Sequence, residues 1–237
     1  MRLKMSEISE DVKQIINTLW DVSETKSVPE TTDIKLAGGA RWIEATYLYA
    51  DLANSSKMAS VLDRRVTAKI IKSFLMGAAK IVALKNGKVV SFDGDRIMAI
   101  FTGDRKNTNA AECGLGINWL VSDVIRNKFE EKYSSISENG IKIIHGTGID
   151  TGRALIVRGG VRGNNDLISI GRAPNMAAKM SDLRGGFTTR LSEEVYSRVH
   201  KDAKYANKDG SLMWEKATWE FLGEEHTIYR STWWRKP

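Results

Sequence analysis

The sequence predicts an α+β fold built on a ferredoxin-like βααββαβ core, with a short N-terminal helix and additional C-terminal strands. Three patterns support this prediction. A strand-like run at 43–52 precedes a long helical run at 55–85, a hairpin-like run follows at 88–101, and amphipathic and β-rich segments alternate beyond it. The composition agrees, because 42% of the 237 residues are hydrophobic and 27% are charged, as in ordinary folded proteins.

The N-terminal part is predicted to be an appendage of the main domain. Residues 6–22 place apolar side chains at mostly helical spacing, which indicates a short amphipathic helix. Residues 23–40 are polar and contain Pro29 and two adjacent glycines, so they are typical of a connector rather than of a packed element. The chain is therefore divided into an N-terminal helix with its linker, residues 1–40, and one domain, residues 41–237.

The main domain is predicted to begin with a strand that ends in an acid. Residues 43–52 are rich in β-forming side chains, and their alternation places Tyr47, Tyr49 and Asp51 on one face. In residues 55–85 an apolar side chain recurs every four positions, which indicates one long helix or two consecutive ones.

The remaining elements follow from the same periodicities. Residues 88–101 contain two β-rich runs joined by Asp93 and Gly94, a dipeptide suited to a tight hairpin turn, so Asp95 is expected at or beside the tip. The other predictions are a helix at 107–133, two strands around glycine-containing turns at 141–159, a strand at 167–171, helices at 173–183 and 191–199, and two strands after Met213.

Charge and cysteine content limit the classes of protein that fit. Lysine and arginine total 36 against 29 acidic residues, and the net charge of +7 favours an anionic partner such as a nucleotide, a nucleic acid or an acidic lipid. The single cysteine, Cys113, cannot form an internal disulfide. No run approaches the roughly 18 apolar residues of a membrane span, and the N-terminus lacks the apolar core of a secretory signal. We therefore expect a soluble cytoplasmic protein without a membrane span.

Two acidic residues stand in unusual places. Asp51 ends an otherwise apolar strand, and Asp95 lies at a hairpin tip with core-like flanks. A carboxylate beside buried surface needs a partner, and a hard dication such as Mg²⁺ or Mn²⁺ is one such partner. The spacing alone also fits a turn residue at Asp95 and a helix cap at Asp51.

Two further polar groups are candidates for nucleotide contacts. Asn54, Ser55 and Ser56 follow the first strand at a strand-to-helix junction, where free backbone N–H groups can bind phosphate, although an ordinary N-cap has the same composition. Asn175 and Lys179 stand four residues apart on one helix face, where they could hold a ribose and a phosphate or simply face solvent.

The order of four sequence blocks adds specificity to these candidates. They read ATYLYADLANSS, VVSFDGDRIMAIF, IIHGTGIDTGRALIVRGG and ISIGRAPNMAAKM. Together they resemble the successive blocks of the class III nucleotidyl cyclases, the adenylate and guanylate cyclase family, over residues 41 to 232. The most specific parts are the glycine and aspartate at positions 94 and 95, the GIDTG segment, and the run from Ile170 to Ala178.

The resemblance implies a role for each block. Asp51, Asp95 and the carbonyl of Leu52 would hold two ions of Mg²⁺ or Mn²⁺, which activate a ribose 3′-hydroxyl and stabilise the displacement of pyrophosphate. Asn175 would orient the ribose. Lys179 stands where family members usually carry an arginine for transition-state charge.

The resemblance also shows departures and implies an assembly. Lysine lacks the planar fork of arginine, so Arg172 is a candidate to share the task of Lys179. Residues 221–225 lack the basic side chains that many relatives use for the triphosphate, so that contact is expected from elsewhere. Because the metal-binding acids of one subunit face the asparagine and base pocket of another in this family, we expect a head-to-tail homodimer with two composite sites.

Neither purine-selecting residue of the family is present. The position four residues before the second metal acid is Ser91, and the position seven residues before the ribose-binding asparagine is Ile168. A hydroxyl and an apolar wall suit a different base, and Tyr49 could narrow the pocket by stacking, although a core aromatic is an equal alternative. The chain is most similar to the pyrimidine cyclases of Pycsar antiphage systems, which make a 3′,5′-cyclic nucleotide from UTP or CTP to activate a separate effector. UTP is weakly favoured.

Other functions stay open at this point. The chain could be an adenylate or guanylate cyclase, or a catalytically weak cyclase-like domain that only binds nucleotide. The net charge and four tryptophans near the C-terminus also fit a nucleic-acid binder. These tryptophans are Trp214, Trp219, Trp233 and Trp234. Core packing explains them better, so no nucleic-acid partner is expected.

Overall fold

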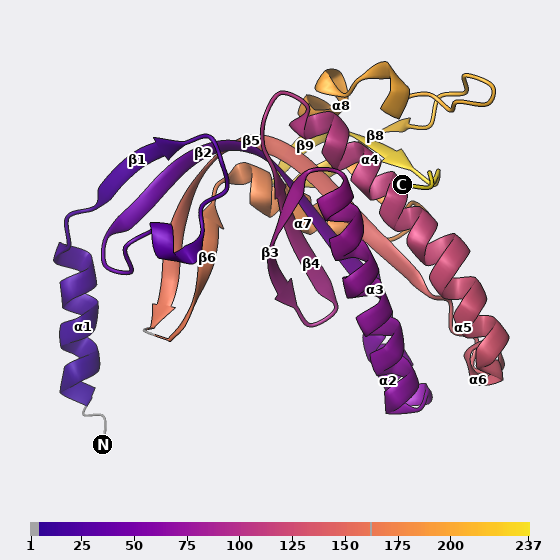
Figure 1. The fold of residues 1–237 in the computed structure, drawn as a ribbon, viewed down its shortest axis with the longest axis horizontal. Coiled ribbons are helices and arrows are strands. Elements are labelled where there is room, and N and C mark those ends of the chain that lie inside the picture. The colour runs from indigo at the N-terminus through magenta and orange to yellow at the C-terminus, as the bar shows by residue number, and fades with distance from the viewer. Residues whose placement is uncertain (1–4, 162) are drawn as a thin grey trace.

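Within the residues that the computed structural model describes, 5–161 and 163–237, the strands form one nine-stranded sheet (Figure 1). The strand order is β3-β4-β2-β5-β7-β9-β8, while β1 pairs with β2 and β6 pairs with β5. The strands are β1 Asp21–Thr25, β2 Gly39–Ala53, β3 Gly87–Asp93, β4 Arg96–Phe101, β5 Ile144–Val161, β6 Asn164–Ile170, β7 Thr189–Ser192, β8 Glu215–Phe221 and β9 Glu224–Ser231.

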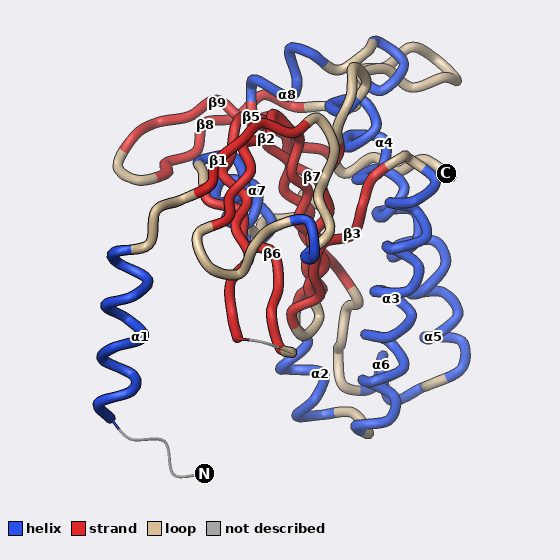
Figure 2. The backbone as a smooth tube through the Cα atoms, turned by 60° about the vertical axis from the view of Figure 1, so that its left-hand side comes forward, coloured by secondary structure: helices blue, strands red, loops and turns tan. Residues whose placement is uncertain are grey.

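Helices cover both faces of the sheet. On one side lie α2, α3, α4 and α5, while α7 packs against the other side (Figure 2). The helices are α1 Met5–Asn17, α2 Ser55–Val61, α3 Arg64–Leu84, α4 Lys106–Trp119, α5 Arg126–Lys132, α6 Ser134–Glu138, α7 Arg172–Asp182 and α8 Glu193–Arg198, with a π-helical segment Leu120–Ile125 and 3₁₀ turns Thr31–Asp33 and Lys201–Ala203. No helix in the described ranges is long and apolar enough to cross a membrane.

The predicted βααββαβ core is confirmed as β2, α2, α3, β3, β4, α4 and β5. The helical run at 55–85 forms two helices, because Leu62 adopts an extended conformation and Asp63 begins a new helix. The Asp63 side chain accepts a hydrogen bond from the backbone N–H of Arg65 at 2.7 Å, which caps the first turn of α3.

The alternation along β2 separates two parts of the core. Leu48 and Leu52 belong to the larger apolar cluster, together with buried residues of α3 and α4. Tyr47 and Tyr49 point to the opposite face, where Ala173 of α7 belongs to the same cluster. The predicted alternation is therefore confirmed, and it places Asp51 on the face that α7 covers.

The prediction of two strands at 141–159 is wrong, because β5 runs unbroken through this segment. Its glycines do not make turns. A Cβ atom on Gly146 would clash with the carbonyl oxygen of Ser181, and one on Gly148 would clash with that of Ala177. The glycines are needed because the backbone of α7 lies directly on β5.

The N-terminal segment contains structure that its polar composition does not indicate. The predicted helix is present as α1, but residues 21–25, expected at the helix end and in a connector, form β1 and pair in parallel with the start of β2. α1 stands clear of the sheet in both views, and Ile8, Val12 and Ile16 are at least half exposed (Figure 1). Strand β7 was also not expected; it begins before the segment predicted to be helical from 191.

The N-terminal end of α7 is held by an ion pair over a buried acid. Arg172 lies at the start of α7, and its Nη2 atom is 2.8 Å from Glu194 Oε1 and 3.9 Å from Asp150 Oδ2. The side chain of Asp150 is fully buried, and its Oδ2 atom has no hydrogen-bond partner among the described residues. Burial raises the pKa of the Asp150 carboxyl, and this effect is partly offset by Ser192 and Arg172.

We expect Gly148→Ala to lower the free energy of unfolding by about 1–3 kcal/mol, because the new methyl group would push the α7 backbone away from β5. Chemical denaturation measures the change. Gly152→Ala on the same strand is the matched control, since the nearest atom to its Cβ would be Ala173 Cβ at 3.5 Å, an ordinary contact. Equal losses in the two variants would contradict this account of the glycines.

Asp150→Asn should raise the free energy of unfolding at pH 7, by on the order of 1 kcal/mol, because it removes a buried charge that folding disfavours. A carboxyl whose pKa is raised in the folded state lowers the free energy of unfolding as the pH rises through that pKa. In acid the carboxyl is protonated and this loss disappears, so the stability gained by Asp150→Asn should shrink. Denaturation between pH 4 and pH 8 tests the sign, and a gain that grows toward low pH would refute it.

The opposite sign is expected at Asp63, where the Arg65 guanidinium and the backbone N–H lower the pKa of the carboxyl to about 2. This carboxylate contributes stability above its unfolded-state pKa, and that contribution is lost as the pH falls toward 2. Asp63→Asn is therefore the contrasting control in the same pH series.

Candidate active site

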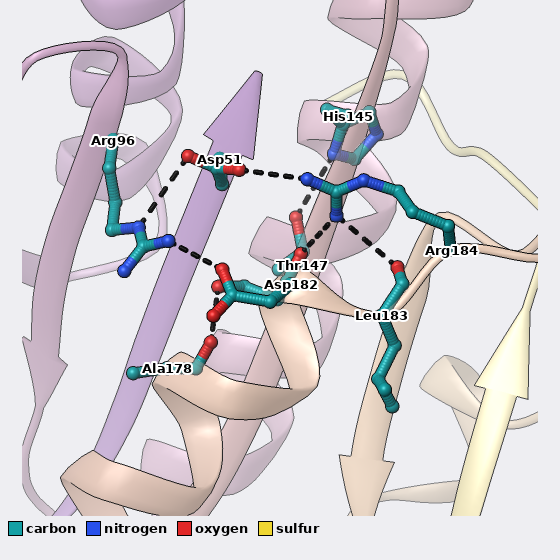
Figure 3. A network of polar contacts seen from close by, with 9 residues as sticks. Asp51, Arg96, His145, Thr147, Ala178, Asp182, Leu183 and Arg184 are labelled. Atoms are coloured by element: carbon teal, nitrogen blue, oxygen red, sulfur yellow. Dashed lines mark hydrogen bonds and ion pairs between the residues drawn. The ribbon is translucent and has the colours of Figure 1, made fainter. Parts of the chain in front are cut away.

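Asp51 lies at the centre of a network of charged side chains at the end of β2 (Figure 3). In the sheet it pairs with Arg96 of β4 on one side and with Gly146 of β5 on the other. Arg184 Nη2 donates a hydrogen bond to Asp51 Oδ2 at 3.0 Å, and Arg96 Nε is 3.5 Å from Oδ1. The carboxylate is thus held between two guanidinium groups from different elements.

The environment of Asp51 raises the pKa of its carboxyl overall, and burial is the largest cause. Its side chain is only 13% exposed. Burial raises the pKa of the carboxyl, Arg96 and Arg184 act to lower it, and the nearby charge of Asp95 acts to raise it. Asp95 is therefore close enough to Asp51 for its charge to act on the Asp51 carboxyl.

Asp95 lies in the turn between β3 and β4, as predicted. Its backbone carbonyl accepts a hydrogen bond from the backbone N–H of Leu52 at 3.3 Å, which ties the hairpin tip to the end of β2. The Leu52 side chain is buried, so only its main chain is available to a ligand.

The donor set fits a hard dication that also binds substrate. Within the described part of the chain, no three or more His, Cys, Asp or Glu side chains are grouped to hold a metal ion. Mg²⁺ is usually bound by one or two carboxylates plus substrate phosphates rather than by an all-protein cage. Asp51, Asp95 and a main-chain carbonyl match that mode of binding.

The two arginines that contact Asp51 are themselves held by groups that the sequence did not single out. Arg96 Nη2 also contacts Asp182 Oδ1, the last residue of α7, at 2.5 Å. Arg184 Nη1 donates to the carbonyl oxygens of Ser181 and Leu183 at 2.8 and 3.3 Å (Figure 3). The sequence did offer a signal for the two arginines: Arg96 directly follows Asp95, and Arg184 directly follows the helix predicted at 173–183.

Arg190 supports this network from beneath. It lies on β7, is 2% exposed, and its Nη2 donates to the main-chain carbonyl of Arg184 at 3.1 Å. Its Nη1 atom is buried without a hydrogen-bond partner among the described residues. Burial lowers the pKa of Arg190 to about 10, with further contributions from Arg184 and Arg230.

His145 also lies near the network (Figure 3), but its environment keeps it neutral. It is buried, and its ring nitrogens lie 3.2 Å from Thr147 Oγ1 and from Asn118 Oδ1. Burial lowers the pKa of His145 to about 3, followed by the effects of three arginines. The imidazole therefore contributes packing and hydrogen bonds at neutral pH rather than positive charge.

Two of the three predicted base-pocket residues share one row across the sheet. Ser91 pairs with Met98, and Met98 pairs with Tyr49 on its other side, so the three side chains are on the same face. Tyr49 Oη donates a hydrogen bond to Met98 Sδ at 3.0 Å. This row is adjacent to the row that contains Asp51. Met98, which the sequence did not indicate, separates the two predicted residues.

The third base-pocket candidate lies in another part of the chain. Ile168 is half exposed on β6, where it pairs with Val157, far along β5 from Gly146. One chain alone therefore does not place Ile168 in the row with Ser91.

The other predicted nucleotide contacts lie in two separate places, at the start of α2 and on one side of α7. Asn54 precedes α2 with φ of 64°, and its side chain makes no capping hydrogen bond, while Ser55 and Ser56 begin that helix. Asn175 and Lys179 are exposed on one side of α7. Asn175 lies about two turns, roughly 10 Å, before the last residue of the helix, so it is remote from Asp51 in the same chain.

Curated relatives cover almost the whole chain. A uridylate cyclase from Rhodovulum sp. (strain MB263) is 51% identical over 232 residues, which cover 98% of this chain and 97% of that protein. Uridylate cyclases from Xanthomonas perforans and Burkholderia cepacia are each 41% identical and cover 93% and 90% of this chain, and 94% and 90% of their own lengths. No protein-family model matches the sequence.

Solved structures show the same fold at low sequence identity. The guanylyl cyclase Cya2 superposes with a TM-score of 0.67 at 17% identity, covering 83% of this chain and 95% of that one. The adenylyl cyclase CyaB from P. aeruginosa gives a TM-score of 0.61 at 20% identity, covering 81% and 95%. With this fold and relatives up to 51% identical, the chain belongs to the uridylate cyclase family of class III nucleotide cyclases.

Proposed function

We propose that this nucleotide cyclase uses bound Mg²⁺ or Mn²⁺ to convert UTP into 3′,5′-cyclic UMP and pyrophosphate. The observation that carries the proposal is the pair of acids Asp51 and Asp95, tied together by the Leu52 main chain. The sequence also lacks the purine-selecting residues at positions 91 and 168. The names of the three relatives that are at least 41% identical support uridine as the base.

In this proposal Asp51, Asp95 and the Leu52 carbonyl hold two ions. Bound metal ions lower the pKa of a ribose hydroxyl and neutralise charge on the phosphates. The protein supplies position: the β3–β4 turn fixes Asp95 relative to the end of β2, and the partial burial of Asp51 strengthens its attraction to any cation. Asn54, Ser55 and Ser56 border this region and are proposed phosphate contacts.

Base recognition is assigned to the row that contains Ser91, Met98 and Tyr49 in the subunit that supplies Asn175, so that this row faces the acids of the partner subunit. Serine can donate or accept a hydrogen bond at the pyrimidine edge, and the Tyr49 ring is held by its bond to Met98. Ile168 would complete the pocket as an apolar wall. A lysine or glutamate at position 91 would instead suit a purine, which argues against an adenylate or guanylate cyclase.

The ribose and leaving-group contacts are assigned to a second copy of the chain. Asn175 and Lys179 are exposed on α7, and Asn175 is remote from Asp51 of its own chain, as a composite site in a homodimer requires. Arg172 is bound to Glu194 and Asp150 at the start of the helix, so Lys179 is the better candidate for the transition-state charge.

The biological part of the proposal follows from the family resemblance. The cyclic nucleotide would act in the cytoplasm as a second messenger in antiphage defence and would activate a separate effector protein. Phage challenge tests this role in two strains. One carries the enzyme with its effector, and the other carries the Asp51→Asn variant with the same effector. Equal survival in the two strains would contradict it.

We expect the purified protein with Mn²⁺ to form cyclic UMP as its main product from an equimolar panel of the four nucleoside triphosphates. Asp51→Asn and Asp95→Asn should each reduce turnover by roughly a hundredfold or more, because each removes a charge contact to the reacting phosphate site. Chromatography of the products provides the measurement. A main product of cyclic AMP, GMP or CMP would refute the base assignment.

Mixing two inactive variants tests the composite site. An equal mixture of Asp51→Asn and Asn175→Ala should regain about a quarter of the wild-type activity, because half of the dimers are mixed and each mixed dimer has one intact site of two. Asp51→Asn mixed with Asp95→Asn, whose changes fall on the same half-site, is the matched control and should stay inactive. No recovery in the first mixture would show that each chain contains a whole site.

A further inference from the structure

We propose that Arg184 exchanges partners during catalysis: it binds Asp51 in the free protein and binds the substrate triphosphate once cations occupy the acids. This inference rests on the proposed function, because it needs Asp51 to bind a cation. It assigns a source for the phosphate contact that residues 221–225 do not supply, since that segment reads FLGEE and contains no basic side chain.

The two guanidinium groups on Asp51 are not equivalent. Arg96 keeps a second carboxylate, Asp182, at 2.5 Å, so it stays paired if Asp51 takes another partner. Among the described residues Asp51 is the only carboxylate within ion-pair distance of Arg184. A cation that binds Asp51 therefore leaves Arg184, rather than Arg96, without a counter-ion.

The position of Arg184 suits an exchange. Its side chain is 44% exposed, so a ligand can reach the guanidinium, whereas Asp51 is 13% exposed. Nη1 stays fixed by the carbonyl oxygens of Ser181 and Leu183, and Nη2 is the group that binds the acid. The guanidinium can thus turn its Nη2 side from the carboxylate to a phosphate while it remains beside the site (Figure 3).

The surroundings make an unpaired Arg184 unfavourable. Arg190 lies beneath it, is almost wholly buried, has one Nη atom without a partner, and forms no ion pair within the described residues. Bound dications would add further positive charge to this region. An anion with several oxygens is the ligand that neutralises this charge and accepts the freed N–H groups, and the triphosphate is that anion.

The exchange predicts that cation and triphosphate bind cooperatively. A cation alone must displace a charge-assisted hydrogen bond of 3.0 Å and leave Arg184 unpaired. When the triphosphate is present, Arg184 has a new partner and this cost disappears. By linkage, each ligand then strengthens the binding of the other.

The test is to replace Arg184 with glutamine and to measure two affinities. Electron paramagnetic resonance of free Mn²⁺ gives the affinity for the cation alone. Equilibrium dialysis with the Mn²⁺ complex of 3′-deoxy-UTP, which lacks the attacking hydroxyl, gives the affinity for cation and triphosphate together. Arg184→Gln should bind Mn²⁺ alone more tightly and the nucleotide complex more weakly, each by roughly five- to tenfold.

Controls separate this result from a general loss of structure. Arg65→Gln removes an exposed guanidinium that pairs with Asp63 at 2.9 Å, and it should leave both affinities unchanged. Arg184→Lys keeps the charge and should show effects of the same signs but smaller size. It serves as the test variant if thermal melting shows that Arg184→Gln is unfolded.

The outcomes distinguish this inference from the proposed function. If Asp51→Asn leaves Mn²⁺ affinity unchanged, the metal assignment is wrong and the exchange is wrong with it. If Asp51→Asn weakens Mn²⁺ binding but Arg184→Gln shifts both affinities in the same direction, or shifts neither, only the exchange is overturned.

Discussion

The close approach of α7 to β5 is the constraint on which the rest of the site depends. Gly146 and Gly148 lack the side chains that would keep the helix at an ordinary distance, so the α7 backbone lies directly on the strand. This contact brings the C-terminal end of the helix to the end of β2. Asp182 therefore reaches Arg96, which begins β4, and Arg184 reaches Asp51, which lies near the end of β2.

The charges around Asp51 are arranged so that a partly buried acid stays paired. Burial by itself would favour the protonated carboxyl, and the guanidinium groups of Arg96 and Arg184 oppose that effect. Arg190, which is buried under the same loop, adds positive charge and holds the main-chain carbonyl of Arg184. In the proposed function the acids would attract a cation and the arginines an anion, as a metal-bound nucleotide requires.

Solved cyclase structures with divergent sequences share the fold of this chain. Guanylyl and adenylyl cyclases with 17% and 20% identity have the same arrangement of strands and helices. Function resides in a few side chains placed on that scaffold. In this chain Ser91, Met98 and Tyr49 form one cross-strand row, so a change at one position of β3 alters that row without altering the sheet.

Local patterns in the sequence determined the core order, the turn at Asp95 and the helix that contains Asn175, because each depends on periodicity or turn-forming residues within a short segment. Only the tertiary structure decided that β5 is a single strand, that residues 21–25 form a strand, and that Arg184 binds Asp51. A glycine in the sequence fits a turn as well as a strand on which a helix packs closely, so the local pattern does not distinguish the two. Strand β1 forms through its pairing with β2, which no pattern within residues 21–25 indicates. Arg184 and Asp51 are 133 residues apart in the sequence, and no local pattern connects them until the α7–β5 contact brings them together.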